Sequence, residues 1–115
     1  MLLRIEAKRI EPDITVLAFS GNITMTSERL RMEDLVEELV SQNSKKLVLD
    51  LTGVDYIDST GMGTIAACFT KVLRANGALR VAGLQDRVSR LFEITHLDRI
   101  IPPYDTVLAA VESPW

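Results

Sequence analysis

The stretch LVLDLTGVDYIDSTGMGTI, residues 47–65, joins the pattern of a buried strand to the start of a helix. Its first part, Leu47–Leu51, is a short apolar run, which is typical of a strand covered on both faces. Residues 52–60 are predicted to form a loop leaving the carboxyl end of this strand, the edge at which parallel α/β sheets gather functional groups. A helix is predicted from about Ser59 to Asn76, with Gly77 in the left-handed C-cap conformation. Its inward face is predicted to comprise Met62, Ile65, Ala66, Phe69, Val72 and Leu73.

Strands and helices alternate along the rest of the chain. Strands are predicted at residues 2–10, 14–19, 78–82 and 99–101, and helices at 26–40, 86–95 and 105–111. A short turn makes the first two strands antiparallel neighbours, whereas the later alternation requires right-handed crossovers and a parallel sheet. The fold class is therefore α/β: one domain over residues 1–115, with a mixed, mostly parallel sheet of about five strands and about four helices.

Composition and charge narrow the function classes. The 115 residues fit one domain, and 47% apolar with 25% charged residues is typical of a globular protein. The net charge is −3 and no basic cluster is longer than the pair Lys45-Lys46, so direct nucleic-acid binding is not expected. The sequence has no apolar run of membrane-spanning length and no leader pattern, which predicts a cytoplasmic protein without membrane insertion. The single cysteine, Cys68, is expected to fill space in the core or on a helix surface rather than to act as a nucleophile.

Three polar residues, Asp58, Ser59 and Thr60, stand where the first backbone N–H groups of the predicted helix lack partners. One of them could cap the helix, and Gly61 and Gly63 could serve tight packing alone. A second interpretation rests on redundancy, because a helix needs only one capping side chain and each glycine within it costs about 1 kcal/mol. On that interpretation Ser59 is an exposed hydroxyl that can be phosphorylated, since the positive end of a helix favours an anion.

The helix face opposite the predicted core stripe carries small and then basic residues: Thr60, Thr64, Ala67, Lys71 and Arg74. A narrow stripe of this kind beside an exposed hydroxyl could be a docking surface for a partner protein. It could equally be a solvated helix face with no specific role. Both interpretations stay open at this point.

Enzymatic and metal-binding interpretations find little support in the sequence. The one histidine, His96, follows the third predicted helix, and Ser59 lacks the G-x-S-x-G setting of a hydrolase. The acids Asp50, Asp55 and Asp58 could suggest a metal site or a receiver domain, but the first parallel strand is not followed by the acidic pair that a receiver needs. The sequence also has no Walker motif. We therefore expect no catalytic residues, no metal and no cofactor.

Taken together, these residues resemble the STAS domain family, and in particular its small single-domain anti-sigma factor antagonists. The run at 47–65 is similar to the family signature, a strand of the form hydrophobic-D-L followed by D-S-[ST]-G-[LM]-G. The segments LRVAGLQDRVSRLFEITHL (79–97) and DRIIPPYDTVLAAV (98–111) resemble the family's third helix, last strand and closing helix. Gly21 falls where the family has a G-E-[LI]-D loop, so the resemblance covers nearly the whole chain.

The resemblance implies a binding switch. Family members bind an anti-sigma factor that is also a serine kinase of the GHKL type, and so free a sigma factor. That kinase inactivates them by phosphorylating the serine after the motif aspartate, which is Ser59 here, and a serine phosphatase reverses the modification. Partner contacts are expected from Asn22, Thr24, Asp58, Thr60, Gly61, Met62, Gly63, Thr64, Ala67 and Lys71.

Departures from the family pattern leave the partner open. Asn22 and Thr24 replace acids that are usual in the G-E-[LI]-D loop, whereas Met62 in place of leucine conserves volume. Two other functions remain: a STAS accessory subunit of a lipid-transporting ABC permease complex, and a small hydrolase that uses Ser59. Binding to a nucleotide-hydrolysing transporter subunit instead of a serine kinase would identify the first, and turnover of simple esters would identify the second.

Overall fold

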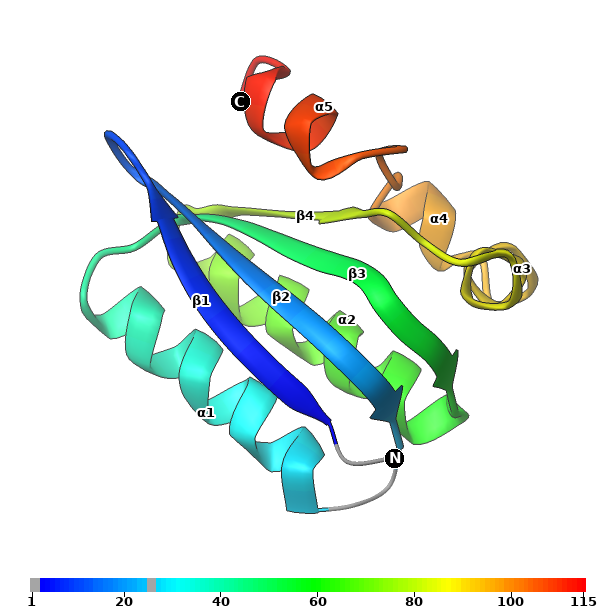
Figure 1. Cartoon of the computed structure of the whole chain (residues 1–115). Helices are drawn as coiled ribbons and strands as arrows, with labels where there is room; N and C mark the ends of the chain where they lie inside the picture. Colours follow the sequence, from blue (N-terminus) through cyan, green and yellow to red (C-terminus); the bar gives the residue numbers. More distant parts are fainter. Residues whose placement is uncertain (1–2, 25–26) are drawn as a thin grey trace.

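A four-stranded sheet in the order β1-β2-β3-β4 organises the molecule (Figure 1). The computed structural model describes residues 3–24 and 27–115, so the predicted element starts at residues 2 and 26 lie outside the described residues. Strands β1 (Arg4–Ile10) and β2 (Ile14–Ile23) form an antiparallel hairpin. Strands β3 (Lys46–Ile57) and β4 (Ala78–Ala82) continue the sheet in parallel. The prediction of a mostly parallel sheet with an antiparallel edge strand is confirmed.

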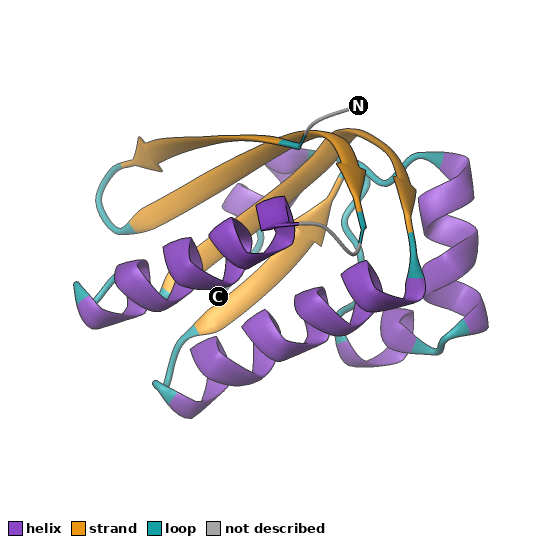
Figure 2. Ribbon diagram, turned by 90° about the horizontal axis from the view of Figure 1, so that it is seen from below, coloured by secondary structure: helices purple, strands orange, loops and turns teal. Residues whose placement is uncertain are grey.

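Two long helices, α1 (Ser27–Ser41) and α2 (Ser59–Arg74), lie side by side on one face of the sheet (Figures 1 and 2). Each connects two parallel neighbours, and the right-handed rule for such crossovers places both helices on the same face. Helices α3 (Asp86–Ile94) and α4 (Leu97–Ile100) follow β4, and α5 (Val107–Glu112) covers part of the opposite face.

Apolar side chains form a core on each face of the sheet. The larger core lies beneath the long helices, and its fully buried members include Leu17, Ile23, Met32, Leu49, Ile57, Ile65 and Phe92. The smaller core lies under α5 and consists of Ile14, Val16, Val48, Ala82 and Ala110. Strand β3 contributes to both cores, so the prediction of a strand covered on both faces is confirmed.

Strand β3 is longer than predicted. The sequence predicts its end at Leu51 and a loop over residues 52–60, whereas the strand runs to Ile57 and the loop is reduced to Asp58. The cause lies at Gly53. Glycine is typical of turns, but here it allows β3 to approach the neighbouring strand closely. A Cβ at Gly53 would lie 2.8 Å from a backbone oxygen of β2.

Strand β2 is also longer, because it ends at Ile23 and not at Phe19. Gly21 therefore lies within the strand instead of forming a turn. Its φ of 106° suits glycine, and the register of β2 against β3 is irregular between Gly21 and Asn22. The two strands extend together past β4 and reach the start of α2 (Figure 1).

The strand predicted at residues 99–101 is wrong. These residues belong to α4 and to the position that ends it. A single bridge between Ala82 and Tyr104 takes the place of a fifth strand, with the Tyr104 N–H donating to the Val81 carbonyl at 2.9 Å. Pro102 and Pro103 have no N–H to donate, which prevents a longer ladder. The described residues form four strands and five helices, instead of the predicted five and four.

The end of α2 also differs from the prediction. The left-handed residue is Asn76, with a φ of 63°, and not Gly77. Gly77 is needed for a different reason, since a Cβ there would lie 2.6 Å from the Lys45 carbonyl oxygen and 2.9 Å from Val72 Cγ1. It lets the chain turn closely from the helix into β4.

Candidate functional site

The first turn of α2 is built on Asp58. This residue is the N-cap, with extended backbone, and its Oδ1 accepts a hydrogen bond from the Gly61 N–H at 2.7 Å. The carbonyl of Asp58 accepts from the Met62 N–H at 2.9 Å, which starts the helical ladder. The capping interpretation is therefore confirmed for Asp58, and the neighbouring hydroxyls are not required as caps.

Ser59 is the first residue of α2 and its side chain is exposed, whereas Thr60 is half-buried. Among the described residues, no side-chain hydrogen bond involves the Ser59 hydroxyl, so the fold makes no use of this group. Asp55 and Asp58 stand nearby in the sequence. The serine hydroxyl is thus available to an enzyme or a partner without any local unfolding.

Gly61 ties the site to the end of β2. A Cβ at Gly61 would lie 2.2 Å from the Ile23 carbonyl oxygen and 2.7 Å from Ile57 Cγ2. The same Ile23 carbonyl accepts from the Asp58 N–H at 3.2 Å. Ile23 lies between Asn22 and Thr24, so the structure brings both of these predicted contact residues to the start of α2. Both are half-buried.

Gly63 has a different environment, since it is exposed and a Cβ there would meet no atom within 4 Å. Its backbone conformation does not favour glycine either, because the positive-φ glycines among the described residues are Gly21 and Gly83. Residues four apart on a helix share a face, so Gly63 lies next to Ser59 on the exposed side of α2. The fold gives no reason for glycine at this position.

The predicted docking stripe does not lie on a solvent-facing side of α2. Thr64 is only 4% exposed, and its hydroxyl donates to the Thr60 carbonyl at 3.0 Å. Lys71, two turns further on, reaches Glu37 of α1 at 3.5 Å. This side of α2 therefore faces α1, and Ala67 is half-buried beside it.

The solvent-facing side of α2 is rotated away from the predicted one. Its exposed residues are Ser59, Gly63, Thr70, Leu73 and Arg74. The predicted inward position of Leu73 is also wrong, since 56% of its surface is exposed, while the inward positions of Met62, Ile65 and Val72 are confirmed.

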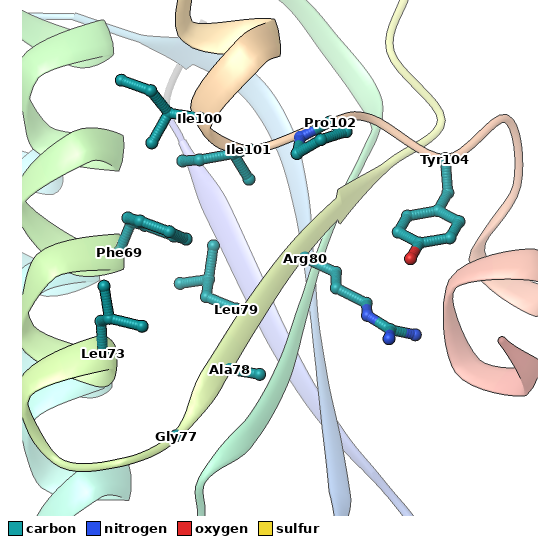
Figure 3. Close-up of a pocket in the computed structure, with 10 residues that line it drawn as sticks. All are labelled: Phe69, Leu73, Gly77, Ala78, Leu79, Arg80, Ile100, Ile101, Pro102 and Tyr104. Carbon is teal, nitrogen blue, oxygen red and sulfur yellow. The ribbon is translucent and has the colours of Figure 1, made fainter. Parts of the chain in front are cut away.

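The sequence missed a groove at the other end of α2 (Figure 3). It is lined by Phe69 and Leu73 of α2, by Leu79 of β4 and by Ile100 and Ile101 after it, and its volume is about 240 Å³. In the sequence, only the apolar pair Ile100-Ile101 could have indicated this groove, and that pair was interpreted as part of a strand. The groove exists because residues 99–101 form no strand beside β4, whereas the sequence predicts one there.

Other reactive groups do not form a site. Burial, and next the charge of Glu33, raise the pKa of the Cys68 thiol to about 12, so this cysteine is a core residue as predicted. In the described part of the chain, Ser59 and His96 share no hydrogen bond, and no group of three or more metal-ligating side chains comes together. None of the helices described is both long and apolar enough to cross a membrane.

Comparison with known proteins establishes the class. The sequence profile of the STAS domain family matches residues 5–110, and the chain therefore belongs to the STAS domain family. An anti-sigma-B factor antagonist of Bacillus subtilis is 35% identical over 101 residues, which cover 88% of this chain and 90% of that protein. That relative is named as an antagonist of an anti-sigma factor.

Solved structures agree on the fold. An anti-sigma factor antagonist from Mycobacterium paratuberculosis aligns with a TM-score of 0.84 at 24% identity, covering 96% of this chain and 92% of that one. Unphosphorylated SpoIIAA, an anti-sigma factor antagonist, aligns with a TM-score of 0.81 at 12% identity, covering 95% of this chain and 94% of that one. At these identities the two structures show a shared fold.

Proposed function

We propose that this protein is an anti-sigma factor antagonist that binds an anti-sigma factor with serine kinase activity, and that phosphorylation of Ser59 ends this binding. The observation that carries the proposal is the exposed Ser59 hydroxyl at the first position of a helix that Asp58 already caps. The 35% identical relative named as an antagonist supports the general function.

The fold can accept a phosphate on Ser59. A phosphoserine adds about −1.5 to −2 charges at neutral pH, and the positive end of the helix offsets about 0.3–1 kcal/mol of the unfavourable interactions. Asp55 and Asp58 oppose the phosphate by a comparable amount where solvent screens them. The two contributions nearly cancel, so the modification changes the surface more than the stability.

Phosphorylation of Ser59 changes the binding free energy of a partner in contact with this residue more than it changes the stability of the fold. A surface complementary to a small neutral hydroxyl must desolvate a dianion after phosphorylation, and a loss of about 2.7 kcal/mol already lowers affinity 10²-fold. The proposed contact surface combines Ser59, Thr60 and Gly63 with Asn22 and Thr24 at the end of β2. Since Asn22 and Thr24 are neutral where relatives usually carry acids, we expect the cognate kinase to differ from theirs at the facing positions.

A solved neighbour supplies a precedent for the modification. SpoIIAA has been determined in a phosphorylated form, which aligns with this chain at a TM-score of 0.74 and 11% identity. This supports the proposal that a domain of this fold can carry a phosphate, while the position Ser59 rests on the motif resemblance and on the exposure of Ser59 at the start of α2.

The proposal is tested by incubating the purified protein with the candidate GHKL-type serine kinases of its source organism and ATP, and locating the phosphate by mass spectrometry. We expect one phosphate, on Ser59, and none in Ser59→Ala. Thr60→Ala is the matched control and should be phosphorylated like the wild type, because Thr60 is half-buried and β-branched. A serine phosphatase should remove the phosphate.

Phosphate found on Thr60, or retained in Ser59→Ala, would contradict the assignment. Binding to a nucleotide-hydrolysing transporter subunit, with no phosphorylation by any kinase, would favour the accessory-subunit function instead.

A further inference from the structure

The groove at the carboxyl end of α2 is an exposed apolar feature on the same helix as Ser59. Phe69, Leu73 and Leu79 converge on it from one side, and Ile100 and Ile101 from the other (Figure 3). Leu73 and Ile100 are 56% and 59% exposed, although both are aliphatic. Exposed aliphatic side chains that gather around a hollow are typical of interaction sites.

The groove is continuous with the exposed side of α2 that begins at Ser59. Gly63, Thr70 and Leu73 follow Ser59 at helical spacing and are all exposed. Fourteen residues separate Ser59 from Leu73, which corresponds to about 21 Å along the helix. Only small side chains stand between them, and a standard interface of about 800 Å² per partner is wide enough to cover both ends.

We infer that this groove is a second contact for the partner that contacts Ser59, and that it receives a large apolar side chain of the anti-sigma factor. This inference rests on the function proposed above. A cavity of about 150 Å³ already holds a benzene molecule, so the 240 Å³ groove is large enough for one such side chain. The groove supplies affinity that does not depend on phosphorylation, while Ser59 supplies the switch.

Charged residues beside the lining residues in the sequence specify the occupant further. Arg74 and Arg99 are exposed, stand next in sequence to the lining residues Leu73 and Ile100, and have no carboxylate partner among the described residues, whereas one exposed acid, Asp105, stands next to the lining residue Tyr104. The partner segment should therefore carry an acidic residue beside its apolar one. A second copy of this chain is a poorer occupant, because it would bring the same arginines together.

The test uses one substitution on each wall, Leu73→Ser and Ile100→Ser, with the kinase identified by the phosphorylation experiment. We expect each variant to raise the Kd for the kinase at least 10-fold. The KM for Ser59 phosphorylation should rise in parallel while kcat stays within twofold. Leu108→Ser is the matched control, since Leu108 is 64% exposed on α5 outside the groove, and it should leave Kd unchanged. Melting curves should confirm that all three variants are folded.

Each outcome decides the inference. Unchanged Kd in both wall variants, while Ser59→Asp loses binding, overturns the groove contact and leaves the proposed function intact. A wild-type protein that neither binds nor is phosphorylated by any kinase overturns the proposed function and the groove contact with it. A wild-type dimer in light scattering that Leu73→Ser makes monomeric, with kinase binding unchanged, shows that a second copy occupies the groove and also overturns the inference.

Discussion

The two glycines in the first turn of α2 lie two residues apart and face opposite environments. Gly61 faces inward, where a Cβ would collide with the Ile23 carbonyl at 2.2 Å. Gly63 faces solvent, where a Cβ would meet nothing. A single motif thus combines a residue that the fold requires with one that the fold does not explain. The inner side of the turn holds the helix against β2, and the outer side, with Ser59, is exposed to solvent.

The largest effect is expected from Gly61→Ala. Alanine would gain about 1 kcal/mol of helix propensity, but its Cβ must displace a backbone carbonyl that cannot rotate away. We expect a net loss of about 2–3 kcal/mol in the free energy of unfolding, measured by urea denaturation. Wild-type stability in Gly61→Ala would show that the inner side of the turn is not tightly packed, and the comparison with Gly63 would fail.

A smaller effect is expected from Asp58→Ala, which removes the acceptor for the Gly61 N–H. Loss of an N-cap side chain costs about 1 kcal/mol, within a range of about 0.5–2. Asp58→Asn is the matched control, because asparagine caps almost as well without the charge. Urea denaturation should therefore place Asp58→Asn close to the wild type. Equal destabilisation in both variants would mean that the charge, and not the cap, stabilises this turn.

The smallest change in stability is expected from Gly63→Ala, and it has the opposite sign. Alanine in an exposed helical position should raise the free energy of unfolding by about 0.5–1 kcal/mol. Because the added methyl group lies beside Ser59, we expect the same variant to bind the kinase several-fold more weakly in a titration. A gain in stability with unchanged affinity would remove Gly63 from the proposed contact surface.

Local patterns were sufficient to predict four of the five helices among the described residues and to place the cap of α2 within Asp58, Ser59 and Thr60. The helix α2 follows from its apolar spacing and its cap from the polar residue before it. Both patterns involve residues that are close in sequence, and the structure has both the helix and the cap. Thr64 and Leu73 were assigned to the wrong sides because the helix packs against α1 as well as the sheet. The hydroxyl of Thr64 is satisfied within its own helix, so a polar residue could be buried without a distant partner.

Two features that depend on distant segments were not predicted. The extension of β3 to Ile57 requires β2 to run alongside it with an irregular register, and Gly53 alone indicated a turn. The fifth strand was expected from the apolar pair Ile100-Ile101, but these residues serve α4 and the groove. The predicted exposure of Ser59, which depends on local sequence, therefore agrees with the structure, whereas the predicted solvent-facing side of α2 does not.

The central claim is that a phosphate on Ser59 changes binding and not folding. The most direct measurement compares the Kd of the cognate kinase for the unmodified protein and for protein fully phosphorylated on Ser59, together with the melting temperature of each form. We predict at least a 10²-fold rise in Kd, with melting temperatures that agree within a few degrees. Equal Kd values for the two forms would contradict the switch, and loss of binding accompanied by unfolding would contradict its mechanism.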